Sequence, residues 1–148
     1  MRIEVDQSGR IEYTRTKTVF AFSNKTNFSI SISAKVKRDA FAILRERYTV
    51  RSCKVRLFAA CLVILLKDIF PKANQIVVDV EFESWDKDIK LMIKNISRKL
   101  GIKVDLNNIS FIFVGKKSRA HEVAVNVFRG ERDPDREIGL EELLAGLK

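Results

Sequence analysis

The chain has 148 residues, of which 46% are hydrophobic and 32% are charged, so it is long enough for one core and too short for two ordinary domains. Its longest strongly apolar run, residues 57–66, is about half of a membrane span, and the N-terminus lacks the basic-then-apolar order of a signal peptide. We therefore expect a single soluble domain over residues 1–148, located in the cytoplasm and without a membrane partner.

The net charge of +9 lies entirely in the first half of the chain. Residues 1–74 hold 15 basic and 6 acidic side chains, whereas residues 75–148 hold 13 of each. Two interpretations stay open for the most basic segment, residues 35–56: a solvated helix face in a protein of thermophilic composition, or a surface that binds the phosphates of nucleic acid. The second interpretation would use Lys35, Lys37, Arg38, Arg45, Arg47, Arg51, Lys54 and Arg56.

Strand patterns come first along the chain. Residues 2–6, RIEVD, alternate apolar and acidic side chains. A turn at Ser8 and Gly9 leads into residues 10–24, which are rich in Thr, Val, Phe and Tyr. After a turn at NKTN, residues 28–35 (FSISISAK) alternate again. These patterns predict three antiparallel strands.

From about Val36 the apolar period becomes helical, and helices then alternate with strands. Pro71 and Gly101 end two of the helices, and Ser118 and Gly130 bound the last long one. The predicted elements are a helix over 36–48, a buried helix from 52 or 53 to about 70, a strand over 75–83, a helix from 84 or 85 to 100, a strand over 109–115, a helix over 118–130, and a tail over 131–148 with a short final helix.

This order resembles the ribonuclease H-like fold, and the resemblance covers residues 2–130. It implies an α/β protein with a mixed five-stranded sheet: three antiparallel strands, then alternating helices and parallel strands. In that family the first strand carries a catalytic Asp near its end, often before a Ser-Gly or Gly turn, as VDQSG has here. The fourth strand lies beside the first and carries a second acid. The resemblance thus implies catalytic and metal-binding roles for Asp6 and Asp79.

Asp6 also has an interpretation that needs no metal, because an Asp three places before a Gly is typical of a type I turn. The pattern around Asp79 favours the metal. An acid inside a Val/Ile run is costly to bury unless it is paired or binds a cation, and Asp79, Glu81 and Glu83 share one face of their strand. If the two strands are neighbours, Asp6 and Asp79 can share Mg²⁺ or Mn²⁺, with Glu81 as a further ligand.

The helix over 118–130 should supply the remaining groups. Asn126 stands where related nucleases commonly carry an Asp; its amide oxygen can ligate Mg²⁺ but adds no charge. Glu122, one turn away on the same face, can replace that acid. His121 can carry a proton to a leaving group, or it is a surface hydrogen bonder. An acid from the first helix would be Asp39 or Glu46, and the spacing does not select between them.

Two functions follow as hypotheses. The first is a divalent-metal-dependent nuclease that hydrolyses RNA, DNA or a hybrid with two ions about 4 Å apart. The second is a non-catalytic domain of the same fold that binds nucleic acid or a protein partner. Phosphate-loop, dinucleotide-binding and serine-hydrolase motifs are absent from the sequence, and a single histidine without a CxxC pair argues against a zinc site.

Overall fold

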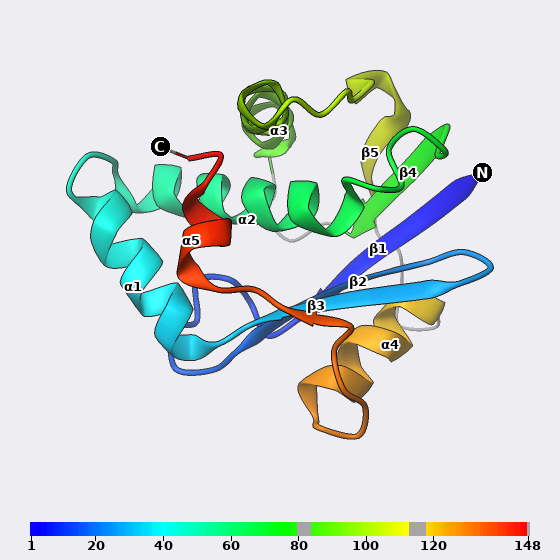
Figure 1. Cartoon of the computed structure of the whole chain (residues 1–148), viewed down its shortest axis with the longest axis horizontal. Helices are drawn as coiled ribbons and strands as arrows, with labels where there is room; N and C mark the ends of the chain where they lie inside the picture. The colour runs from blue at the N-terminus through cyan, green and yellow to red at the C-terminus, as the bar shows by residue number, and fades with distance from the viewer. Residues whose placement is uncertain (80–83, 113–117, 148) are drawn as a thin grey trace.

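The computed structural model describes residues 1–79, 84–112 and 118–147, which form a mixed α/β fold (Figure 1). The strands are β1 (Arg2–Ser8), β2 (Thr18–Ser23), β3 (Asn27–Ile32), β4 (Gln75–Asp79), β5 (Ile109–Ile112) and β6 (Arg136–Glu137). The helices are α1 (Ala34–Arg45), α2 (Val50–Leu66), α3 (Asp86–Leu100), α4 (Arg119–Phe128) and α5 (Leu140–Leu144), with a short 3-10 turn at Leu106–Asn108.

The strands form one six-stranded sheet in the order β5-β4-β1-β2-β3-β6. The first three strands pair antiparallel, β1 with β2 and β2 with β3. The later strands join in parallel: β4 beside β1, β5 beside β4, and β6 beside β3. The middle of the sheet therefore places β1 between an antiparallel and a parallel neighbour.

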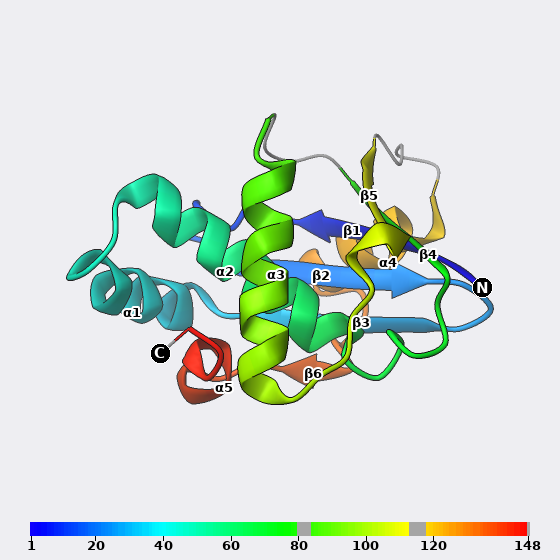
Figure 2. The same cartoon turned by 90° about the horizontal axis from the view of Figure 1, so that it is seen from above.

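Helices cover the two faces of the sheet unequally. Figures 1 and 2 show α1, α2, α3 and α5 on one face and α4 on the other. Alternation along β2 explains the division, since Phe20 packs in the main core under α2 while Val19 and Ala21 pack with Val123 and Val127 of α4. Along β2, alternate side chains therefore face the α2 layer and the α4 layer.

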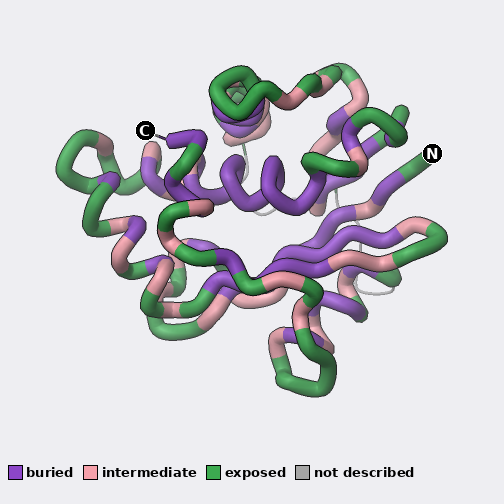
Figure 3. Tube along the Cα trace, viewed as in Figure 1, coloured by how far each residue is buried: buried purple, intermediate pink, exposed green. Residues whose placement is uncertain are grey.

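Helix α2 is the centre of the main core (Figure 3). Every residue over 57–66 is buried, as the apolar character of this helix on all sides predicts. Thr49 caps its first turn by accepting a hydrogen bond from Ser52 N at 3.1 Å, so the helix begins at Val50, two to three residues before the predicted start. It ends at Leu66, before the predicted end near residue 70.

Several other boundaries also differ from the sequence prediction. Residues 10–17 form turns instead of the start of a strand, and β2 begins at Thr18. Ser33 caps α1, so the last predicted residues of the third strand belong to the helix. Ser84 has a positive φ of 66° and does not cap α3, whereas Gly101 and Ser118 are the predicted helix caps. Residues 80–83 of the predicted strand over 75–83, and residues 113–115 of the predicted strand over 109–115, lie outside the described residues.

Strand β6 is an element that the sequence pattern does not predict, and it makes the sheet six-stranded rather than five-stranded. Its sequence is polar and follows Pro134, so no alternation marks it. Tertiary bonds hold it instead: the Asp135 carboxylate accepts from Ser29 N at 2.8 Å, and Ile138 N donates to Ser31 O at 2.9 Å. None of the helices in the described part of the chain is long and apolar enough to span a membrane.

Candidate functional site

Asp6 is an acidic side chain that is almost completely buried in the centre of the sheet. It lies on β1 opposite Ala21, and Ala21 packs against α4, so Asp6 faces the α4 layer and not the main core. Only 5% of its surface is exposed. One carboxylate oxygen accepts a hydrogen bond from Gln7 N at 2.8 Å. Asp6 therefore belongs to the strand, which continues to Ser8 before the chain turns at Gly9.

Asp79 is the neighbour of Asp6 across the parallel ladder. The register pairs Ile3 with Ile76 and Val5 with Val78, and continuing it by one residue sets Asp6 beside Asp79. Paired residues in register point to the same face of a sheet, so both carboxylates face the α4 layer. Asp79 is the last residue of β4 and is half-buried. The two acids predicted from the sequence are thus brought together.

His121 joins the acid pair from the first turn of α4. Its Nδ1 lies 2.7 Å from the second carboxylate oxygen of Asp6, although the residues are 115 positions apart. Ser118 caps the helix by accepting from His121 N at 3.0 Å, which fixes the backbone that carries the ring. With Asp6 ionised, Nδ1 carries the proton and donates it to the carboxylate, so Nε2 is the basic ring atom.

The electrostatics of Asp6 follow from this setting. Burial raises the pKa of Asp6 from 3.8 to about 6, and the charge of Asp79 adds to the rise. The hydrogen bond from Gln7 N and the contact with His121 act in the opposite direction. Asp6 is consequently half protonated at a pH about two units higher than the pH at which a free aspartate is half protonated.

The donor set fits a hard divalent cation held by two carboxylates. Mg²⁺ typically takes one or two protein carboxylates and completes its shell with water and substrate oxygens. A cation between Asp6 and Asp79 would offset the repulsion between the two carboxylates, which contributes to the raised pKa of Asp6. Within residues 1–79, 84–112 and 118–147 no group of three or more His, Cys, Asp and Glu side chains is placed to hold a metal, and Glu81 lies outside these ranges.

The structure does not bring the other two residues of the predicted site into this cluster. Glu122 is exposed and pairs with Arg119 at 3.1 Å. Asn126 follows His121 by five residues, which sets the two side chains about 140° apart around α4. Its half-buried side chain therefore leaves the helix on another side from the ring that contacts Asp6.

The predicted phosphate-binding residues lie on the opposite face of the sheet, with α1 and α2 (Figure 1). Lys37 is a correction, because it is fully buried and its ammonium group donates to Tyr13 O at 2.5 Å, Thr18 Oγ1 at 2.9 Å and Arg10 O at 3.4 Å. A side chain held in this way reaches no phosphate. The remaining predicted residues are exposed or partly exposed: Lys35, Arg38, Arg45, Arg47, Arg51, Lys54 and Arg56.

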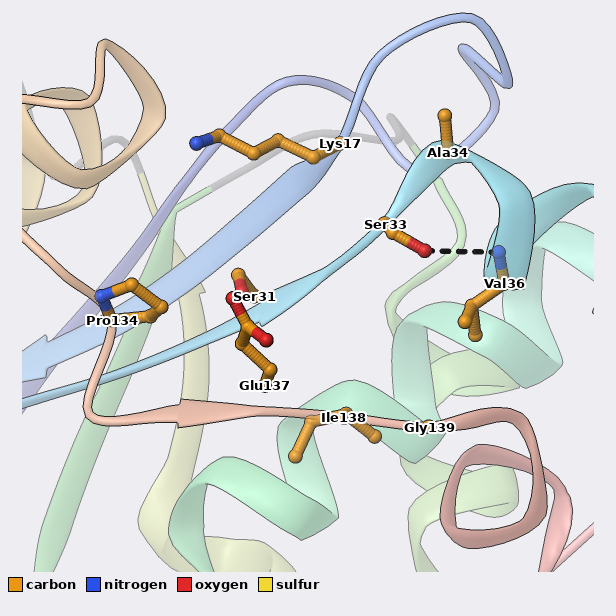
Figure 4. A pocket seen from close by; sticks show the side chains of 9 residues that line it. All are labelled: Lys17, Ser31, Ser33, Ala34, Val36, Pro134, Glu137, Ile138 and Gly139. Atoms are coloured by element: carbon orange, nitrogen blue, oxygen red, sulfur yellow. Dashed lines mark hydrogen bonds between the residues drawn. The ribbon is translucent and has the colours of Figure 1, made fainter.

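A sizeable cavity lies away from the acid pair. About 460 Å³ opens between β3, β6 and the start of α1 (Figure 4). Its polar groups already serve the fold: Ser33 Oγ accepts from Val36 N, and Lys17 Nζ donates to Val127 O at 3.1 Å. None of Asp6, Asp79 and His121 lines it.

No family model matches this chain, and no curated protein sequence matches it. The site is therefore interpreted from its own geometry.

Proposed function

We propose that this protein is a divalent-metal-dependent nuclease of the ribonuclease H-like fold. The observation that carries the proposal is the placement of Asp6 and Asp79 on adjacent parallel strands with both carboxylates on one face. The strand order around β1, with β2 antiparallel and β4 parallel to it, agrees with the resemblance noted in the sequence. The resemblance extends over five of the six strands, and β6 is an addition at the edge.

The chemistry assigned to the chain is hydrolysis of a phosphodiester. Asp6 and Asp79 would hold the cation, which when bound would supply Lewis-acid activation of the phosphate and of water. His121 orients Asp6 through Nδ1 and can exchange a proton at Nε2. In the hydrolytic step the oxygen of water forms a bond to phosphorus, the bond from phosphorus to the leaving oxygen breaks, and a proton from the water passes to that leaving oxygen.

Cleavage assays on matched variants test the proposal. Purified protein is incubated with labelled single-stranded RNA, duplex DNA and RNA–DNA hybrid, with Mg²⁺ or Mn²⁺ and with a chelator. We expect chelator-sensitive cleavage that Asp6→Asn and Asp79→Asn each abolish. Asp68→Asn, the same change at an exposed acid after α2, should leave it intact. Cleavage that persists in Asp6→Asn would assign the activity to another site.

A second candidate function is a non-catalytic domain that binds nucleic acid or a protein. The ion pair of Glu122 with Arg119 favours this alternative. Glu122 is not part of the cluster, so the cluster has two carboxylates, whereas the nuclease hypothesis expects a third acid from α4. Binding without cleavage of any of the three substrates would select this alternative.

A further inference from the structure

A basic trough runs along one flank of α3, on the sheet face that carries α1, α2, α3 and α5. It consists of two adjoining hollows of about 240 and 200 Å³, one between the starts of α2 and α3 and one between α2, the end of α3 and the C-terminal turn. Met92 lines both hollows, so they adjoin at this side chain. We define the α3 trough by Arg51, Arg56, Leu91, Met92, Arg98 and Lys99.

Positive charge dominates this trough. Among the described residues, Arg51, Arg56, Arg98 and Lys99 line it together with one acid, Asp88. Asp88 pairs with Arg51 at 2.7 Å, so these two charges offset each other and the positive excess comes from Arg56, Arg98 and Lys99. Arg98 also lines a neighbouring hollow of about 550 Å³ together with Lys94, Lys103 and one acid, Asp105, so a net positive surface continues around the end of α3. A ligand of matching charge is a polyanion.

Two of the guanidinium groups are held in place by aromatic rings. Arg56 lies over the ring of Tyr48 at 3.6 Å, and its Nε donates to Ser52 Oγ at 3.1 Å. Arg51 lies over the ring of Trp85 at 4.9 Å. Stacking fixes the orientation of these planar groups, so less side-chain entropy is lost when they bind an anion.

The trough has the dimensions of a short nucleic-acid strand. Between Asp88 and Lys99, eleven residues of helix extend about 16 Å. Successive phosphates of one strand rise by about 3.4 Å along a duplex, so roughly five fit this length. Leu91, 56% exposed, adds an apolar surface next to the charges, which suits a base better than it suits a carboxylate side chain.

We infer that the α3 trough binds one strand of nucleic acid through its phosphates, on the sheet face opposite to the acid pair. This inference rests on the proposed function for its ligand class and names the surface that holds the substrate. It differs from the sequence hypothesis, in which residues 35–56 as a whole form the grip, because the helix α3 supplies half of the cations.

The test compares salt dependence of binding among paired variants. A fluorescein-labelled 20-nucleotide single strand is titrated with protein in chelator, in an Asp6→Asn background, and anisotropy is followed at several salt concentrations. The trough variant is Arg51→Ala with Arg98→Ala. A matched control removes two exposed lysines elsewhere, Lys25→Ala with Lys72→Ala, and a rival variant changes the outer face of α1, Lys35→Ala with Arg38→Ala.

Each phosphate contact with a single strand contributes about 0.7 to the slope of log K against log salt concentration. We expect the trough variant to lower the magnitude of this slope by roughly 1.4, from two contacts at that value, and the control and rival variants to leave it unchanged. An unchanged slope in the trough variant overturns the inference, and so does an equal loss in the α1 variant. Cooperative urea unfolding of each variant verifies the fold.

A competitor decides between nucleic acid and an acidic protein. Poly-glutamate at equal charge concentration should displace the strand less effectively than unlabelled strand does. Equal displacement would overturn the inference in favour of an acidic protein partner. Because binding is measured in chelator, it is independent of cleavage: absence of cleavage with a trough-dependent slope rejects the nuclease and keeps the trough, whereas cleavage with an unaffected slope does the reverse.

Discussion

Asp6 shows how a local sequence pattern can mark a position without deciding the role of its side chain. The Ser8-Gly9 turn does follow it, and Gly9 has the positive φ of 74° that a turn there requires. The carboxylate itself is not part of that turn, since its partners are Gln7 N, on the same strand, and the ring of His121. The local pattern marks the position, and only the tertiary structure decides the role.

The raised pKa of Asp6 makes a prediction about stability and pH. A carboxyl group with a pKa of about 6 in the folded state and 3.8 as its ordinary value binds more protons when folded, so its stabilising effect is complete below pH 3.8 and is lost as the pH rises through 6. The loss is on the order of 3 kcal/mol. We expect the unfolding free energy of the wild type to fall between pH 4 and pH 6.5 relative to that of Asp6→Asn, measured by urea denaturation.

The control for this prediction removes the ring of His121, which contacts Asp6. In a His121→Gln background the same comparison is repeated, and the window should move to higher pH because the contact with His121 lowers the pKa of Asp6. Parallel pH profiles for the wild type and Asp6→Asn would contradict the raised pKa.

The site could be predicted from the sequence only in part. The alternation of residues 2–6 sets Asp6 on the strand face away from Val5, as the structure has it. The approach of His121 to Asp6 has no sequence signal, because it depends on how α4 crosses the sheet. Helical periodicity alone could have separated Asn126 from His121, since five residues are not a whole number of turns.

At the scale of the elements, Lys37 connects α1 to the segment between β1 and β2. Residues 10–17 read as a strand from their composition but contain turns, and Ile11 among them is fully buried. Their carbonyl groups need donors, and the buried ammonium of Lys37 supplies them for Arg10 and Tyr13. A lysine in a basic run carries no sequence signal of this role, which explains why the sequence pattern predicts a surface position for Lys37.

Replacing Lys37 should therefore destabilise the protein. Lys37→Met keeps the aliphatic stem and removes this donor from the Tyr13 carbonyl and the buried Thr18 hydroxyl, so we expect a loss of about 3 kcal/mol in the free energy of unfolding in urea. Lys35→Met, two residues earlier on the exposed side of α1, loses only an ion pair with Asp39 and should change stability by less than about 1 kcal/mol. Equal losses would show that the buried bonds of Lys37 contribute nothing.

Strength of local pattern determines which elements are predictable. Helix α2 is apolar on all sides and β3 alternates along its length, so both appear in the sequence. Strand β6 has two residues and depends on Asp135 bonding to Ser29, more than a hundred positions away. Short edge strands of this kind are specified by tertiary bonds and leave no periodic signal.

Across the whole molecule, the acid pair and the α3 trough occupy opposite sides of the sheet. Asp6 faces α4, whereas α3 packs over α2 in the other helix layer (Figures 1 and 2). A long strand can occupy both sites only by passing around the sheet, and a short one can occupy one site at a time. The trough proposed to hold the substrate is thus separated from the acid pair proposed for hydrolysis.

This separation predicts that substrate length decides the effect of trough mutations. A strand of four nucleotides, about 14 Å long, is shorter than the trough alone, so its cleavage should depend on the acid pair only. For a 25-nucleotide strand, Arg51→Ala with Arg98→Ala removes two charge contacts at about 0.5 kcal/mol each, which corresponds to a roughly fivefold higher KM. The kcat should stay unchanged, because the lost contacts lie away from the reacting phosphate. Steady-state cleavage of both substrates measures this. A KM that rises equally for the four-nucleotide strand would mean that the trough and the acid pair act as one continuous site.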